Sequence, residues 1–327
     1  VQGMGPALST TAQLHAFREI WGVYGTHQSI WMSATLDARW LRTVDFKPFG
    51  PKLQEWHLSD NEANSPVVTA KKPINQLPFS VTKDFSFVQE LARHIVREHQ
   101  PGSLTLVVLN QVSRAQKVKQ ALDALGATAE VILVHSRYRS GDRKRIEAAL
   151  FSPIPPEGRI IVSTQVIEAG IDISARLLYT ELASWGALVQ RFGRCNRRGE
   201  YSDSAVYWWD IDDESEMKLP YTDDEINAAR AIIREMTDAS IALLPQEVGG
   251  TVSHHPVIRQ ADLLALFDTA SDLSGMDVDG SRFIRDKQTL DVSVFWRSFE
   301  DGADHQPDAD MKELCPVSLA GLKRYLD

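Results

Sequence analysis

The chain has 327 residues, 43% of them hydrophobic and 24% charged, with a formal net charge of −9. This length exceeds one average domain and can bury a sizeable core, so we expect two units plus an appendage. The sequence contains no run of eighteen apolar residues and no N-terminal charged-then-apolar segment, so we expect neither a membrane-spanning helix nor secretion.

The chain has two cysteines, Cys195 and Cys315, which are isolated from each other and from histidines. No CxxC pair and no Cys/His spacing typical of a metal site occurs, so we expect no disulfide framework and no bound metal held by this chain. Both thiols are expected to be small buried residues, and the reducing cytoplasm is the expected location.

The net charge is distributed unevenly along the chain. Residues 1–199 hold 24 Lys and Arg against 17 Asp and Glu, a balance of +7, whereas residues 200–327 hold 11 against 27, a balance of −16. A bound polyanion would therefore lie on the first part, because the acidic part would repel it.

Short apolar segments alternate with amphipathic ones through the first two thirds of the chain. The apolar pattern predicts strands, and the 3.6-residue pattern predicts helices, which gives a parallel sheet covered on both faces. A proline-rich segment, 46–82, is expected to be a linker plus an edge strand. The predicted strands are 28–36, 104–110, 130–136, 159–164, 176–182 and 205–211, and the predicted helices are 14–25, 84–99 and 112–125.

The acidic remainder has a mixed pattern. After residue 211 it predicts helices at 223–244, 257–268 and 317–326 and an alternating strand at 289–296. We therefore expect an acidic α+β region behind the parallel sheet.

Polar residues follow four of the predicted strands at the point where each ends. In open α/β sheets ligands bind at the carboxyl ends of the strands, so these placements predict a functional rim. The residues are Ser33 and Thr35 after the first strand, then Asn110, then Ser136 and Arg137, and then Thr164.

The stretch STQVIEAGIDIS, residues 163–174, leads from a strand end toward a helix. The backbone N–H of Thr164 is suited to a phosphate there. Gly170 permits a turn that a side chain would block, and Asp172 can accept hydrogen bonds from a ribose hydroxyl. An ordinary strand-to-helix turn with a capping Asp explains the stretch equally well.

The stretch QRFGRCNRRG, residues 190–199, has four arginines and no acid. In a helix, Gln190, Arg194 and Arg197 lie on one face, and Arg191 and Arg198 point elsewhere. Two guanidinium groups and an amide on one stripe suit the charge that spreads over a γ-phosphate during its transfer. A solvated basic helix face is the alternative.

Taken together, these segments carry a resemblance to a known family. SAT (33–35), STQVIEAGIDIS and QRFGRCNRRG resemble motifs III, V and VI of superfamily 2 helicases, in the usual order. IWMSATLDARWL, NQVSRAQKV and HSRYRSGDR are similar to the CRISPR-associated helicase-nuclease of type I interference. The segment DTASDLSGMDVDGSRFIRD is most similar to the type I-G branch, formerly called I-U.

The resemblance implies a fold class and a division of the chain. The fold would be α/β, with residues 1–47 the remnant of a first RecA-like domain and residues 48–211 a second RecA-like helicase domain. Residues 212–327 would form an acidic α+β accessory region. The sequence has no GxxxxGK[ST] phosphate loop, and its opening resembles the family from inside motif II onward, after the Asp-Glu pair. We therefore expect the C-terminal portion of a longer enzyme, inactive alone.

The resemblance also implies roles for single residues. ATP and Mg²⁺ would be held mainly by the first RecA-like domain, which carries the metal ligands. The implied roles in this chain are catalysis by Gln190, Arg194 and Arg197, cofactor binding by Gly170 and Asp172, coupling by Ser33 and Thr35, and contact with DNA by Asn110, Ser136, Arg137 and Thr164.

The implied function is that of an ATP-dependent helicase or translocase moving along single-stranded target DNA in CRISPR interference. The implied partners are the CRISPR effector (surveillance) complex, the N-terminal RecA-like domain and an HD nuclease domain in cis or in trans. The residues themselves leave two alternatives open: a non-enzymatic nucleic-acid-binding or interaction module, and another superfamily 2 motor, such as an RNA helicase or a DNA-repair translocase.

Overall fold

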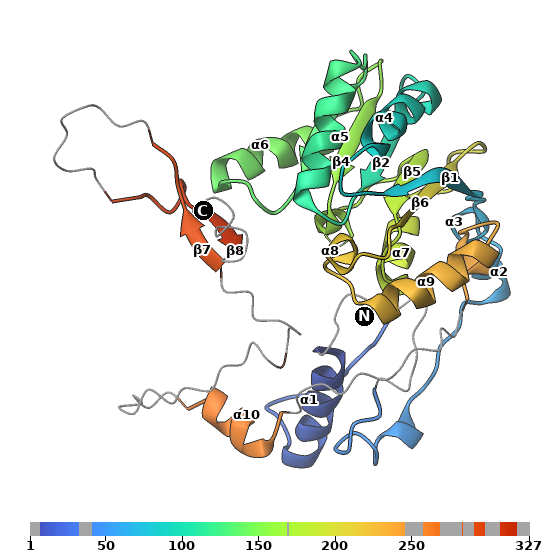
Figure 1. The fold of residues 1–327 in the computed structure, drawn as a ribbon. Coiled ribbons are helices and arrows are strands. Elements are labelled where there is room, and N and C mark those ends of the chain that lie inside the picture. Colours follow the sequence, from blue (N-terminus) through green and yellow to red (C-terminus); the bar gives the residue numbers. More distant parts are fainter. Residues whose placement is uncertain are drawn as a thin grey trace. The chain divides into compact units, whose positions relative to one another are not determined.

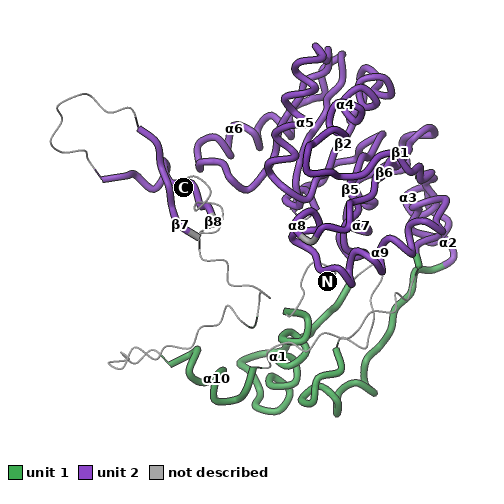
Figure 2. The backbone as a smooth tube through the Cα atoms, in the orientation of Figure 1, with its two compact units in different colours: residues 1–59, 245–289 green, residues 60–244, 290–327 purple. Residues whose placement is uncertain are grey.

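The computed structural model describes residues 7–32, 41–168, 170–245, 258–268, 283, 291–297 and 308–318. The chain forms two compact units (Figure 2). Unit 1 consists of residues 1–59 and 245–289, and unit 2 of residues 60–244 and 290–327. None of the helices in the described ranges is long and apolar enough to cross a membrane. The expected domain boundaries at residues 47 and 211 stay a prediction.

Unit 2 is built around a six-stranded sheet in which all neighbouring strands are parallel (Figure 1). This confirms the expected RecA-like α/β fold, including an edge strand within residues 46–82. The strands, in their order across the sheet, are β1 (Ile74–Val81), β6 (Ala205–Ile211), β5 (Leu177–Glu181), β2 (Leu104–Val108), β4 (Arg159–Ser163) and β3 (Glu130–Val134).

Helices connect these strands and cover the sheet. α4 and α5 contact each other, whereas α6 packs on β3 and α7 on β5. The right-handed rule for crossovers, applied to this strand order, predicts α4 and α5 on one face of the sheet and α6 and α7 on the other. The connecting elements are α4 (Phe87–Glu98), α5 (Val112–Ala124), α6 (Ser140–Phe151), the 3₁₀ turn η3 (Gln165–Ile167) and α7 (Trp185–Phe192). The expected helices 84–99 and 112–125 are confirmed, whereas α6 was not anticipated.

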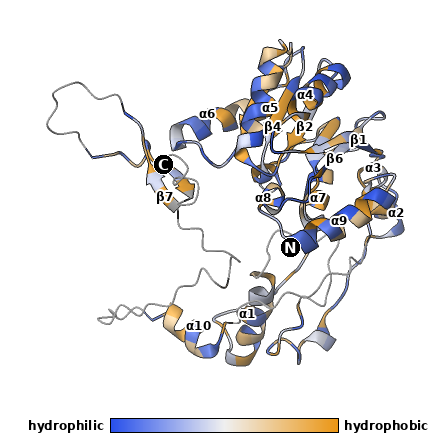
Figure 3. Cartoon of the chain, viewed as in Figure 1, coloured by the Kyte–Doolittle hydropathy of each residue, from blue (hydrophilic) through white to orange (hydrophobic). Residues whose placement is uncertain are grey.

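The core of unit 2 lies on the central strands, where hydrophobic residues concentrate (Figure 3). Every residue of β2, β4 and β5 is buried, as the continuous apolar runs predict. Trp208 and Trp209 are at most 1% exposed, and Phe87 lies 6.5 Å from Trp209 between ring centroids. Both cysteines are buried, as expected.

The chain after β6 adds short elements to unit 2: α8 (Ser215–Lys218), α9 (Asp223–Glu235) and the 3₁₀ turn η4 (Ile241–Leu243). A capping box between Thr222 and Glu225 begins α9, which packs against α7. The helix expected over 223–244 is therefore too long. The segment after Glu235 is extended instead, and Asp238 forms a bridge with Pro73.

Two further strands of unit 2 pair antiparallel, β7 (Asp291–Val294) with β8 (Cys315–Ser318). They confirm the strand expected within 289–296. The helix expected at 317–326 is wrong at its first two residues, which belong to β8, and the rest of it lies outside the described residues.

Unit 1 contains α1 (Ala7–Trp21), the 3₁₀ turn η2 (Gly50–Lys52) and α10 (Gln260–Leu266). Two small apolar clusters hold it together: Leu8, Ala12, Leu41 and Phe46 in one, and Phe17, Ile258 and Phe283 in the other. The strand expected over 28–36 is wrong for residues 28–32, which form no strand, and its remainder lies outside the described residues. The four-residue helices α2 (Asp60–Ala63) and α3 (Pro66–Thr69) belong to unit 2.

Candidate functional site

The carboxyl ends of the parallel strands meet at one edge of the sheet, where three of the four expected polar groups come together. β3 and β2 flank β4 in continuous register, so residues that follow these strands are neighbours. The groups are Asn110 after β2, Ser136 and Arg137 after β3, and Thr164 after β4. The fourth group, Ser33 and Thr35, lies outside the described residues.

Asn110 lies at the centre of this edge, and it is buried. Its side-chain nitrogen donates to the Leu182 carbonyl at 2.8 Å, and its backbone N–H donates to the Glu181 carboxylate at 2.8 Å. Its side-chain oxygen accepts from Arg191, and its carbonyl accepts from Gln165, both at 2.9 Å. All four polar groups of Asn110 are thus used to join the ends of β2, β4 and β5. Its contact with DNA stays a prediction.

Arg191 is fully buried and ties the same strand ends to α7. Burial raises the pKa of its partner Glu168, against the opposing effect of the Arg191 charge. The guanidinium has five acceptors: Glu168 at 2.9 Å, the Thr180 hydroxyl at 2.9 Å, the Glu181 carbonyl at 3.1 Å, Asn110 at 2.9 Å and the Tyr221 hydroxyl at 3.2 Å. Arg191 is therefore an internal cross-link between α7 and the strand ends.

The expected helical stripe of Gln190, Arg194 and Arg197 is wrong, because α7 ends at Phe192. Gly193 occupies the C-cap, and the chain then turns. Gln190 remains on the helix and is half-buried, whereas the two arginines lie on the turn, so their directions are set by their own contacts.

Arg194 forms a second link between the stretches 163–174 and 190–199. Its Nε donates to the Ile167 carbonyl at 3.1 Å, and its Nη2 donates to the Glu168 carbonyl at 2.6 Å. The side chain is buried, and burial, followed by the nearby Arg197 charge, lowers the pKa of Arg194. The turn after α7 is thereby fixed to the segment that follows β4.

Arg197 and Arg198 remain at the surface and share one carboxylate. Arg197 Nε lies 2.9 Å from Asp172, and Arg198 Nη2 lies 3.6 Å from it. The side chains of Arg197 and Asp172 are 45% and 67% exposed. Gly170, two residues before Asp172, has a φ of +77°, which explains the need for glycine there. One group of exposed charges therefore lies on the turns that contain Asp172, Arg197 and Arg198.

The β3 end supplies a second exposed group. Ser136 and Arg137 are exposed, whereas Thr164 on the neighbouring strand end is buried. His135 is buried and stacks on Tyr138 with centroids 4.0 Å apart, and its Nδ1 accepts from the Arg137 N–H at 3.1 Å. Burial, followed by the Arg137 charge, lowers the pKa of His135 to about 4, so the ring is neutral at pH 7.

The sequence reasoning missed a buried ion pair beneath the rim. Arg114 Nη1 lies 2.8 Å from Glu181, and the two side chains are 1% and 0% exposed. A second nitrogen of Arg114 donates to the Met217 carbonyl at 2.7 Å. The helical period could have located it, because Arg114 lies four residues before Val118 on the buried face of α5.

Comparison with known proteins gives consistent matches. Residues 101–200 match the family described as CRISPR-associated nuclease/helicase Cas3, C-terminal. A CRISPR-associated helicase Cas3 of Thermoproteus tenax is 30% identical over 148 residues, covering 45% of this chain and 24% of that protein. A putative CRISPR-associated nuclease/helicase Cas3 of Myxococcus xanthus is 36% identical over 133 residues, covering 40% of this chain and 17% of that protein.

The chain also matches a crystal structure of T. fusca Cas3 with ATP. The match covers 50% of this chain and 22% of the T. fusca chain, with 20% identity and a TM-score of 0.44. The matched regions amount to about a quarter or less of the length of these relatives. The type I-G assignment stays a prediction. By sequence this chain is similar to CRISPR-associated Cas3 helicases, and its match to the Cas3 C-terminal family spans residues 101–200.

Proposed function

We propose that this chain supplies the second RecA-like domain of an ATP-dependent DNA helicase or translocase in CRISPR interference. In this proposal the complete protein moves along single-stranded target DNA. The observation that carries it is the link from Arg194 to the carbonyls of Ile167 and Glu168. That link joins the two stretches with helicase-like sequence to each other by two hydrogen bonds.

A rigid link of this kind suits a motor domain. A motor must convert a change at the nucleotide into a change at the DNA, and rigid bodies transmit such displacements whereas loose loops absorb them. Arg194 and the buried Arg191 join the turn after α7 to the ends of β2, β4 and β5. Movement of the turn would therefore move the DNA-facing rim with it.

Arg197 is the best candidate for direct contact with a γ-phosphate. Its guanidinium is about half exposed, and its partners within the described part of the chain are Asp172 and the Gly193 carbonyl at 3.3 Å. A phosphate oxygen can replace the carboxylate of Asp172 as its partner, and the released Asp172 is then free to accept from the ribose. Arg194 acts as a positioning residue in this scheme. Gln190 and Gly170 keep their proposed roles in catalysis and nucleotide binding.

The DNA strand is proposed to follow the carboxyl ends of β3 and β4. Arg137 and Ser136 are exposed there, whereas Thr164 at the adjacent strand end is buried and its N–H donates to the Val134 carbonyl at 3.2 Å. Arg143 donates to the Ser136 carbonyl at 3.3 Å and so adds a second positive charge beside this path. Contacts of this type read phosphates and not bases, so binding would be independent of DNA sequence.

The remaining roles follow from the family relationship and stand as proposals. The nucleotide is ATP with Mg²⁺ held by the first RecA-like domain, with Ser33 and Thr35 coupling that domain to this one. The recruiting partner is the CRISPR effector complex, and the nuclease is an HD domain in cis or in trans.

The test is steady-state ATP hydrolysis, with and without single-stranded DNA, by this chain joined to the RecA-like domain that carries its phosphate loop. Arg197→Ala should lower DNA-stimulated hydrolysis by roughly 10³-fold or more while ATP binding is retained, as loss of an arginine finger does. Arg198→Ala is the matched control, since Arg198 contacts the same carboxylate from the neighbouring position. It should stay within a few-fold of the wild type.

Three outcomes would contradict the proposal. Wild-type hydrolysis by Arg197→Ala would remove Arg197 from catalysis. Absence of any DNA-stimulated hydrolysis by the wild type, with DNA binding intact, would favour a nucleic-acid-binding module. Stimulation by RNA in preference to DNA would favour another motor of the same superfamily.

A further inference from the structure

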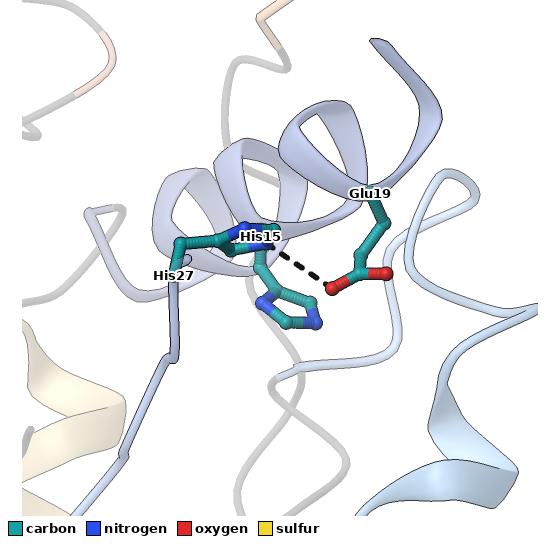
Figure 4. A group of neighbouring side chains, drawn as sticks. All are labelled: His15, Glu19 and His27. Carbon is teal, nitrogen blue, oxygen red and sulfur yellow. Dashed lines mark ion pairs between the residues drawn. The ribbon is translucent and has the colours of Figure 1, made fainter. Parts of the chain in front are cut away.

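A cluster of three potential metal ligands lies in unit 1. His15 and Glu19 are one helical turn apart on α1, and His27 comes from the segment that follows the helix (Figure 4). One ligand atom from each residue lies within 4.8 Å of the other two. The sequence carries a signal for the first pair, because residues four apart on a helix share one face.

The chain returns His27 to the helix by a turn rich in glycine. Gly22 ends α1 with a φ of +73°, and its N–H donates to the Arg18 carbonyl at 2.9 Å. Gly25 has a φ of +98° two residues before His27. These conformations are open to glycine and strained for other residues, so the turn is specific to this sequence.

Only some of the potential metal-ligand atoms of the cluster form hydrogen bonds within the described part of the protein. Nε2 of His27 is buried and has no hydrogen bond, although Oε1 of Glu19 lies 3.1 Å away (Figure 4). Nδ1 of His15 lies 3.0 Å from the Ser29 hydroxyl, which leaves the other ring nitrogen, Nε2, available. A metal-bound histidine typically uses its second ring nitrogen in just such an outer hydrogen bond, which fixes the tautomer and the ring orientation.

The surroundings of His15 also suit a bound ion. Three aromatic rings contact its imidazole edge-on: Trp31 at 5.7 Å, Phe46 at 5.6 Å and Phe49 at 6.1 Å between centroids. An apolar shell of this kind limits water and rotation around one side of a site. Glu19, which is 38% side-chain exposed, faces solvent on the other side and leaves a route for entry.

We propose that His15, Glu19 and His27 bind one divalent transition-metal ion, with Zn²⁺ the best match. Two imidazoles and one carboxylate form a ligand set typical of Zn²⁺, at metal–ligand distances of about 2.0–2.2 Å, with the fourth position left to water. Closing the cluster around such an ion requires the ligand atoms to approach one another by about 1 Å, which rotation of the Glu19 side chain and of the loop holding His27 can provide. The ion would fasten residues 22–32 to α1. Ser33 of the predicted coupling motif follows this segment directly.

The test is titration of the whole chain, stripped of metal by a chelator, with Zn²⁺ by calorimetry and with Co²⁺ by visible absorption. The wild type should bind one equivalent and give the intense Co²⁺ band of a four-coordinate site. His15→Gln, Glu19→Gln and His27→Gln should each lose more affinity than the roughly 10–100-fold that loss of an outer-shell partner costs. Ser29→Ala, which removes only the outer hydrogen bond, should fall within that range.

His57→Gln is the matched control, because it removes an exposed histidine of the same unit, and it should bind as the wild type does. Circular dichroism of the metal-free variants identifies any that fail to fold. Glu19→Gln changes a solvent-facing side chain and remains decisive if a histidine variant unfolds. Absence of stoichiometric binding by the wild type overturns the proposal. So does binding that survives Glu19→Gln and His27→Gln unchanged, since the ion then lies elsewhere.

Discussion

Single buried arginines determine the architecture of this site more than the exposed arginines do. Arg191 has five acceptors and no exposed surface, whereas Arg197 and Arg198 share one solvent-facing carboxylate. Removing a buried charge leaves its partners desolvated and unpaired, whereas a surface pair contributes little.

Arg191→Met should therefore lower the free energy of unfolding of unit 2 by roughly 3–5 kcal/mol, because Glu168 and the strand-end oxygens lose their donor. The measurement is urea unfolding followed by the fluorescence of the buried Trp208 and Trp209. Arg198→Met, the surface control, should change stability by no more than about 0.5 kcal/mol. Adding Glu168→Gln to Arg191→Met should restore part of the loss. Equal effects of Arg191→Met and Arg198→Met would mean that the cross-link does not stabilise the fold.

The low pKa of the single residue His135 predicts that the stability of the fold depends on pH. Its pKa is about 4 in the folded chain against 6.5 in the unfolded chain, so protons bind the unfolded state more readily. The contribution of His135 to stability is then complete above pH 6.5 and is lost as the pH falls from 6.5 toward 4. Relative to His135→Gln, the wild type should lose on the order of 2–3 kcal/mol over this interval. Parallel stability profiles of the two proteins between pH 7 and 4 would contradict the buried, neutral ring.

At the scale of elements, the turn after α7 depends on a close backbone approach. Gly199 ends the QRFGRCNRRG stretch with a φ of +71°, and a Cβ there would lie 2.6 Å from the Pro66 carbonyl oxygen. Gly102 has the same φ of +71°, but a Cβ there would meet no atom within 4 Å. Substitution of the two glycines therefore separates the free energy of backbone strain, present at both positions, from that of the steric clash with Pro66, present only at Gly199.

Gly102→Ala should cost about 1–2 kcal/mol of unfolding free energy from the left-handed conformation alone. Gly199→Ala should cost a further 1–3 kcal/mol or so, because the backbone at Pro66 must move to admit the methyl group. Urea unfolding of the two variants gives the difference directly. An equal cost at both positions would show that α3 moves away freely and does not hold the turn.

Much of the sheet could be predicted from the sequence, because its strands are buried on both faces and read as continuous apolar runs. β2, β4 and β5 each lie within one or two residues of their expected ends. The ends of helices were harder to predict. α1 stops at Trp21, because Gly22 takes a left-handed conformation that the apolar pattern past it does not reveal.

The site could be predicted in its location but not in its contacts. Parallel pairing brings the carboxyl ends of the strands to one edge of the sheet, and the alternation of strands and helices predicts that pairing. Whether an arginine is buried depends on acceptors distant in sequence, such as Asn110 for Arg191, 81 residues away, and no local pattern reports this. Trp296 lies in the segment whose alternating pattern predicts a strand, yet it is 74% exposed, because packing needs a partner that local alternation does not report.

At the scale of the whole molecule, the charge division and the fold agree on where a polyanion can lie. The part with a balance of +7 includes the ends of β2, β3 and β4, whereas the part with a balance of −16 begins after the last arginine-rich turn. Acidic residues in that second part would repel a DNA strand, which favours a DNA path along the carboxyl edge of the sheet.

Binding of single-stranded DNA to the whole chain should therefore be electrostatic and should weaken as salt is added, whatever the base sequence. Arg137→Ala should weaken binding uniformly across sequences and reduce the slope of log K against log salt by about 0.7, the value for one lost phosphate contact on a single strand. Arg97→Ala is the matched control: Arg97 is exposed near the end of α4, which runs back from the carboxyl edge of β1 toward the amino edge of β2. Fluorescence anisotropy at several salt concentrations measures all three proteins. If Arg97→Ala reduced the slope as much as Arg137→Ala, binding would depend on the net charge of the protein and not on the position of the charge. That result would contradict a DNA path along the carboxyl edge of the sheet.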